Sequence, residues 1–254
     1  IYIEFKNFKY YLKFFFCVKI NFSFFIKVIK ITKNMICIFK FNNTIFSYET
    51  DSLIQSNTQD TLIFTRSDFL LSNFKLIADD GSIIKFENTF AFVKGSSPDT
   101  IKLPLSIPSG NYVSLSFDLG LDSAVNHSDP SLWLPNHPLN PSFNNLHWGW
   151  TGGYVFAALE GYYQNMGVKT PWLYHIALDE NQTNVNLPGS FDLTDFKTLE
   201  IKWNSEMTFS NLFSLRPGVD GDFTHSSNDN GLASKIAQNL GASFESGLLK
   251  DRDP

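Results

Sequence analysis

The sequence predicts an all-β fold: an antiparallel β-sandwich of the immunoglobulin-like type, with long loops and one C-terminal helix. Short runs rich in β-branched and aromatic residues recur from about residue 60 and are separated by turn-forming residues. The run 111–120 alternates between apolar and polar residues, as a half-buried strand does. The late segment 231–244 has apolar residues at the spacing of an amphipathic helix. Many short strands followed by one helix are typical of a sandwich.

The strands are expected to be short and joined by turns. Asp79-Asp80-Gly81 lies between two β-prone runs, and an Asp-Gly pair in that position predicts a β-hairpin. The strands expected are 60–66, 69–77, 82–86, 89–94, 111–120, 152–162, 172–178 and 198–203. The apolar face of the alternating strand 111–120 is expected to consist of Val113, Leu115, Phe117 and Leu119.

One helix and two long loops complete the expected domain. In the helix, a single apolar face is formed by every fourth residue, and its start is expected to be capped within Asn228 to Asn230. The members of this face are Leu232, Ile236, Leu240 and Phe244. Loops as long as 121–146 and 204–230 are usually functional or disordered in a compact domain.

The composition changes sharply at about residue 50. Residues 1–50 hold eight Lys against two Glu, eleven of the 26 Phe, and both cysteines, Cys17 and Cys37. Their apolar runs are interrupted by Lys and follow no helical or strand period. We therefore expect 1–50 to lie outside the domain, as an export signal or as spurious upstream translation, and 51–254 to form one domain.

Charge and motifs exclude several classes of function. A net charge of −5 argues against a nucleic-acid partner, which requires a basic surface. No apolar stretch after residue 50 is long enough for a transmembrane helix, although a lipid anchor remains compatible with the sequence. G-x-S-x-G, P-loop and H-E-x-x-H patterns are missing from the sequence, so we do not expect an enzyme.

Two histidines are the most informative candidates for metal ligands. His175 lies within an expected strand, on the face opposite to Trp172 and Tyr174, and His127 follows the end of another strand. Two imidazoles without cysteine suit copper or zinc better than magnesium or calcium. Asp129 could orient the His127 ring. Taken alone, however, His175 fits a hydrogen-bonded core residue better than a metal ligand, and the segment around His127 fits an ordinary turn better than a metal site.

A pair of tryptophans precedes the strand 152–162. Trp148 and Trp150 lie on the same side of an extended segment because one residue separates them. They could plug the core, stack on a ligand, or form a wall beside a metal ion.

Six segments between about residues 60 and 245 together carry a resemblance to a known family. They are FLLSNFKLIADDG, SFDLGLDSAVNHSDP, Pro138-Leu139-Asn140, LHWGWTGGYVFAALEG, LYHIAL, and a tail with His225, Ala233-Ser234-Lys235 and Asn239. In this order they resemble the MbnP-like copper-binding protein family, relatives of the copper-binding proteins MopE and CorA. Two positions depart from the family pattern: Leu146-His147 stands where Met and an aromatic residue are common, and Ala177 where Gly is common.

The resemblance implies a β-sandwich with a mononuclear copper site held by two histidines. Carried over to this sequence, these ligands are His127 and His175. The family also implies export behind a signal peptide to a periplasmic, outer-membrane-associated or secreted location, and a di-haem peroxidase-like partner. In well-studied members a tryptophan is oxidised to kynurenine and helps to bind copper. The candidates for modification or for additional ligation are Trp148, Trp150, Trp133 and His147.

Two other classes of function remain compatible with the residues. A carbohydrate- or surface-binding module without metal would use the loops rich in Asn and Trp. A purely structural exported domain would need none of these side chains. A copper titration distinguishes these two classes from the metal-binding hypothesis. Only a copper-binding protein would bind the ion and lose it when His127 or His175 is replaced.

Overall fold

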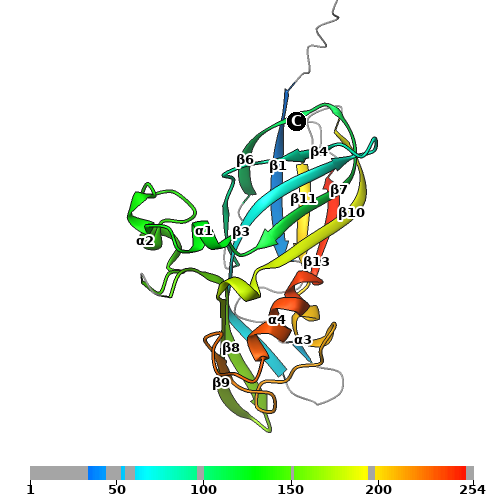
Figure 1. Ribbon diagram of the computed structural model, residues 1–254. Helices are drawn as coiled ribbons and strands as arrows, with labels where there is room; N and C mark the ends of the chain where they lie inside the picture. The colour runs from blue at the N-terminus through cyan, green and yellow to red at the C-terminus, as the bar shows by residue number, and fades with distance from the viewer. Residues whose placement is uncertain are drawn as a thin grey trace, which may run out of the picture. The chain divides into compact units, whose positions relative to one another are not determined.

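The computed structural model describes six ranges of the chain: 34–43, 53–54, 61–95, 100–149, 152–193 and 198–249. Within them the chain forms two β-sheets that pack face to face, with few helices (Figure 1). The predicted all-β sandwich is confirmed. Within the described ranges, no helix is long and apolar enough to cross a membrane.

The larger sheet has nine strands, in the order β10-β7-β3-β8-β9-β12, with three short strands that also pair with β3. All of its pairings are antiparallel except that between β9 and β12. Its strands are β2 (Leu53–Ile54), β3 (Thr61–Ala78), β4 (Ile83–Lys85), β5 (Ala91–Lys94), β7 (Gly110–Leu119), β8 (Val155–Asn165), β9 (Val168–Ala177), β10 (Thr183–Leu193) and β12 (Phe223–Thr224).

The smaller sheet begins N-terminal to the expected domain boundary at residue 51. Its order is β13-β11-β1-β6, and β1 pairs parallel with β11 and antiparallel with β6. Because β1 is hydrogen-bonded on both sides, the folded unit includes part of the segment that we expected to stand outside it. Residues 1–33 and 44–50 lie outside the described ranges, so their expected roles stay predictions. The strands are β1 (Asn34–Asn43), β6 (Thr100–Pro108), β11 (Thr198–Trp203) and β13 (Phe244–Leu249).

Aromatic side chains join the two sheets in the main core. The Trp203 ring of β11 meets two rings of β3, Phe64 at 5.6 Å and Phe69 at 5.0 Å between centroids, both edge to face. Trp172 of β9 meets Phe64 at 5.1 Å in the same manner. Such edge-to-face pairs add to the burial of large apolar surface, which is the main stabilising term of the sandwich.

Strand β3 corrects two expectations. The runs 60–66 and 69–77 are a single strand of 18 residues, bent by irregular pairing on both sides. Its register against β7 shifts between Ile77 and Ala78. Next to this shift, Tyr112 is buried and Val113 is 45% exposed, so Val113 does not join Leu115 on the core face as predicted. The Asp-Gly hairpin from β3 to β4 is confirmed.

The predicted late helix is confirmed, with a shorter apolar face than expected. Helix α4 (Leu232–Gly241) buries Leu232, Ile236 and Leu240, whereas Phe244, which we expected on the same face, begins β13. The Asp229 carboxylate, within the segment expected to cap the helix, accepts hydrogen bonds from the backbone N–H groups of Gly231 and Ala233. Helix α3 (Met207–Ser210) lies in the loop expected at 204–230.

The loop 121–146 packs on the face of the larger sheet that points away from the main core. It contains α1 (Ser123–Asn126), the short 3₁₀ helix Pro130–Leu132 and α2 (Pro141–Asn144), and both α1 and α2 lie to the left in Figure 1. A second apolar cluster forms between this loop and the sheet. Its buried members are Leu70, Leu121, Leu139, Leu146, Tyr154, Val155, Phe156 and Ala158.

Gly161 generates a stability prediction, because the sheet leaves no room for a side chain there. A Cβ at this position would overlap the carbonyl oxygen of Ile63 and lie 2.9 Å from the Trp172 ring. We expect Gly161→Ala to lower the free energy of unfolding by about 1–3 kcal/mol, as overpacking does. Urea denaturation measures this. The control is Gly110→Ala, where the Cβ would meet nothing within 4 Å, and equal effects of the two changes would contradict the packing described.

Candidate functional site

A row of polar side chains crosses three adjacent strands on the outer face of the larger sheet. In the strand register Arg66 of β3 lies opposite Glu160 of β8, and Ala158 lies opposite His175 of β9. Side chains alternate between the faces of a strand, so Glu160 and His175 both point away from the core that holds Trp172 and Tyr174. The predicted orientation of His175 is therefore confirmed.

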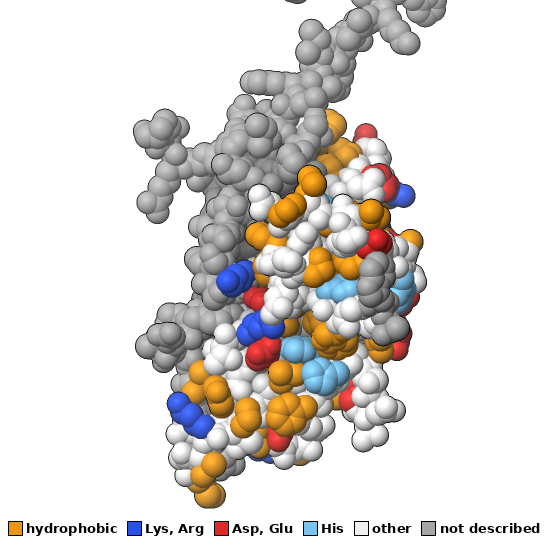
Figure 2. Space-filling view, turned by 90° about the vertical axis from the view of Figure 1, so that its left-hand side faces the viewer, with side chains coloured by type: hydrophobic (Ala, Val, Ile, Leu, Met, Phe, Trp, Pro, Cys, Tyr) orange, Lys and Arg blue, Asp and Glu red, His pale blue; other side chains and the backbone are white. Residues whose placement is uncertain are grey.

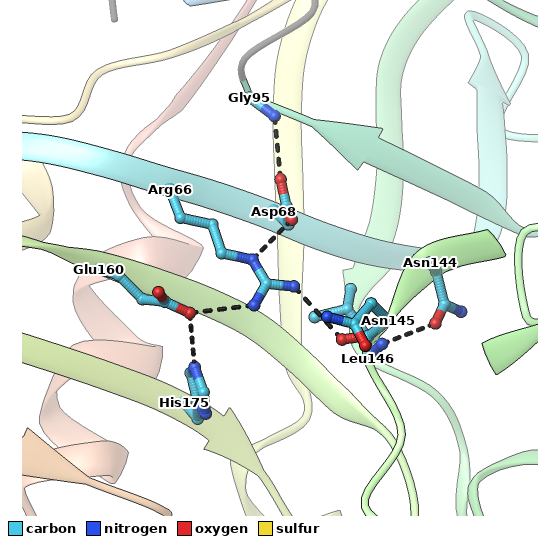
Figure 3. Close-up of polar contacts among 8 residues, drawn as sticks. All are labelled: Arg66, Asp68, Gly95, Asn144, Asn145, Leu146, Glu160 and His175. Carbon is cyan, nitrogen blue, oxygen red and sulfur yellow. Dashed lines mark hydrogen bonds and ion pairs between the residues drawn. The ribbon is translucent and has the colours of Figure 1, made fainter. Parts of the chain in front are cut away.

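Glu160 links the row through one carboxylate oxygen. Its Oε1 accepts a hydrogen bond from Arg66 Nη1 at 3.0 Å and lies 2.9 Å from His175 Nε2 (Figure 3). Arg66 is fixed in turn by Asp68, whose Oδ2 accepts from Arg66 Nε at 2.7 Å. Burial acts to raise the pKa of Glu160, but the hydrogen bonds from His175 and Arg66 prevail, so this pKa lies below its ordinary value. The carboxylate is consequently an acceptor only.

This contact determines which nitrogen of His175 carries the proton. Burial lowers the pKa of His175 below its ordinary value, against the opposing effect of Glu160, so the ring is neutral near pH 7. A neutral imidazole has one N–H, and it lies on Nε2 because Glu160 can only accept. Nδ1 is left with a lone pair. It is buried and, within the described ranges, has no hydrogen-bond partner.

Two further rings surround His175. The centroid of Trp148 lies 6.0 Å from that of His175 and 5.5 Å from that of His225. His175 and His225 are themselves 5.3 Å apart, with 64° between their planes. Figure 2 shows that histidine side chains gather on one face of the molecule, bordered by hydrophobic side chains. Sequence reasoning identified Trp148 and His175 but assigned no role to His225 in the second long loop.

His127 lies near the C-terminal end of β9, where it contacts a different carboxylate. It follows α1, and its Nε2 is 3.3 Å from Asp179 Oδ1, just beyond β9. Asn126 fixes this corner, because its amide donates to Asp179 Oδ1 at 2.7 Å and accepts from the backbone N–H of Tyr154. The carboxylate that faces His127 is therefore that of Asp179. Asp129, which we expected in that role, caps the 3₁₀ turn that follows it.

The remaining candidates make other contacts. His147 Nδ1 accepts from the backbone N–H of Gly149, and its ring meets that of Tyr154 at 4.5 Å. Trp133 stacks on His137 at 4.2 Å with 10° between the planes. Trp150 lies outside the described ranges.

Within those ranges, His, Cys, Asp and Glu form no group of three or more arranged as a metal site, so the two-histidine site stays a prediction.

An open cleft of about 420 Å³ adjoins the polar row. Glu160 lines it, as does Asn145, whose carbonyl accepts a hydrogen bond from Arg66. Solvent therefore reaches Glu160 while the His175 ring stays largely covered. The remaining lining residues are Thr65, Arg66, Asp68, Phe92, Lys94, Phe143 and Asn144.

Comparison with known families identifies the chain. The family model described as MbnP matches residues 30–224, which is most of the sequence. The chain belongs to the MbnP family. The solved structure of MbnP from Methylosinus trichosporium matches with 18% sequence identity and a TM-score of 0.49, covering 86% of this chain and 99% of that one. A comparison with curated proteins finds no match.

The contact between Glu160 and His175 generates a spectroscopic prediction. Imidazole ¹⁵N chemical shifts of the neutral protein are expected to show the Nε2–H tautomer at His175. In Glu160→Gln this preference should weaken, because an amide can donate as well as accept. His137, which stacks on Trp133, is the internal control and should not change. An unchanged His175 tautomer in Glu160→Gln would refute the assignment.

Proposed function

We propose that this member of the MbnP family binds one copper ion on the outer face of its larger sheet, with His175 as the central ligand and His127 as the second. The protein would serve the acquisition or handling of copper, and not catalysis. The observation that carries the proposal is the bare, buried Nδ1 of His175. A buried lone pair without a donor costs free energy unless something occupies it, and a metal ion does so.

The partner of Nε2, the other ring nitrogen of His175, also supports a role in metal binding. Histidines that bind metals almost always donate their other N–H to a carboxylate, a carbonyl or water, which fixes the tautomer and the ring orientation. Glu160 takes this place at His175. Asp179 faces Nε2 of His127 in the same way, at 3.3 Å. Both predicted ligands thus have a carboxylate at one nitrogen.

The chemistry of these donors fits copper. Neutral imidazole suits copper and zinc, while magnesium and calcium prefer oxygen. The family resemblance favours copper over zinc. His127 contacts Asp179, which follows His175 by four residues along the chain.

Copper titration of the purified chain tests the proposal. Wild type is expected to bind one equivalent of Cu(I), measured anaerobically against a chromophoric competitor. His175→Ala should abolish stoichiometric binding, and His127→Ala should weaken it by at least about tenfold, the lower limit for disturbing a metal ligand. His137→Ala is the matched control, since it removes an imidazole whose ring stacks on Trp133. Binding that survives His175→Ala would contradict the proposal.

We further propose that oxidation to kynurenine, where it occurs, falls on Trp148. Among the tryptophans in the described ranges, Trp148 is the one with a ring contact to His175, and its side chain is 37% exposed. A di-haem partner outside the cytoplasm would supply the oxidation, as the resemblance implies. Fragmentation mass spectrometry of protein from the native host should find the modification at Trp148. A modification at Trp133 or Trp150 instead would overturn this assignment.

A further inference from the structure

We propose that His225 is a further ligand of the copper ion that His175 holds, so that the second long loop completes the site. The inference rests on the proposed copper function and adds a ligand to it. It starts from the position of β12, which pairs parallel with β9 and places Phe223 opposite Leu173 and Thr224 opposite Tyr174. The next residue of the loop, His225, therefore comes beside His175, and their ring centroids are 5.3 Å apart.

The backbone at His225 is held firmly against β9. The Ser226 hydroxyl donates to the carbonyl of His175 at 2.8 Å and accepts from the backbone N–H of Ala177 at 2.7 Å. Ser226 N–H donates to the Thr224 hydroxyl, and Ser226 adopts a left-handed φ of 63°, a conformation that non-glycine residues keep only where their surroundings fix it. These bonds hold the Cα of His225 next to β9 whichever rotamer its ring adopts.

The distance between the rings suits one shared ion. A metal–nitrogen bond of about 2.0–2.1 Å places each imidazole centroid roughly 3.2 Å from the ion. Two such rings then lie roughly 5–6 Å apart for angles between tetrahedral and trigonal at the metal, which includes the observed 5.3 Å. The observed separation therefore matches that of two imidazoles on one ion.

The two rings offer complementary properties. His175 is largely buried, has a fixed tautomer and leaves Nδ1 without a partner within the described ranges. The His225 side chain is exposed, so it can turn towards an incoming ion. Trp148 contacts both rings. The site would thus combine a rigid, buried ligand with a movable, exposed ligand beside an indole ring.

The decisive experiment compares the removal of the proposed ligand His225 with the removal of Glu160, which only positions the ligand His175. The full chain, His225→Ala, Glu160→Gln and His175→Ala are titrated with Cu(I) under the same competitor. Loss of an outer contact such as Glu160 is expected to weaken binding by about 10–100-fold. His225→Ala should cost at least as much as Glu160→Gln. Pulsed EPR of the Cu(II)-loaded proteins should count one imidazole fewer in His225→Ala than in wild type.

The outcomes separate this inference from the proposed function. Suppose that wild type binds copper and that His175→Ala does not bind it. If His225→Ala then keeps the wild-type affinity within about threefold and the wild-type number of imidazoles, the inference is wrong and the proposed function stands. If wild type binds no copper, both fail. His225→Gln, which keeps a polar side chain of similar reach, is expected to behave as His225→Ala does. If thermal unfolding of the metal-free proteins shows that His225→Ala disturbs the fold, His225→Gln is used in its place.

Discussion

The arrangement of the site depends on one carboxylate oxygen, Oε1 of Glu160, which meets Arg66 and His175 at once. Because Glu160 can only accept, it places the single proton of the neutral His175 ring on Nε2. Nδ1 keeps its lone pair, is buried, and has no hydrogen-bond partner among the described residues. Arg66, fixed by Asp68, keeps the carboxylate in position, so a network across three strands determines the chemistry of one nitrogen.

This network lies on the outer face of the larger sheet, away from the main core. The inner face of the larger sheet carries the main core, which is built from buried apolar side chains. On the outer face, the loop 121–146 covers one part of the sheet with a second apolar cluster, and the polar row follows where that cover ends. His175 is thereby shielded enough to stay neutral and close enough to the surface to be reached.

The two long loops approach β9 at two neighbouring places. The first brings His127 to Asp179, just past the end of the strand, and Asn126 fixes it there by bonding both Asp179 and the backbone of Tyr154. The second brings His225 beside His175, and Ser226 fixes it by bonding the backbone of β9. In both cases a buried polar residue next to the histidine holds the backbone of the loop in place.

The sequence by itself determined the all-β class, most strands, the late helix and the orientation of His175, because each follows from local periodicity of apolar and polar residues. Only the tertiary structure decided which side chains meet. The sequence suggested Asp129, two residues from His127, whereas the folded chain places Asp179 against that ring. His225 has no local signal, since a loop histidine gains such a neighbour only when distant strands pair. The merging of two predicted strands into β3, the burial of Tyr112 in place of Val113, and the inclusion of β1 in a sheet have the same cause. Register and pairing are set by contacts between segments far apart in sequence, which no local pattern records.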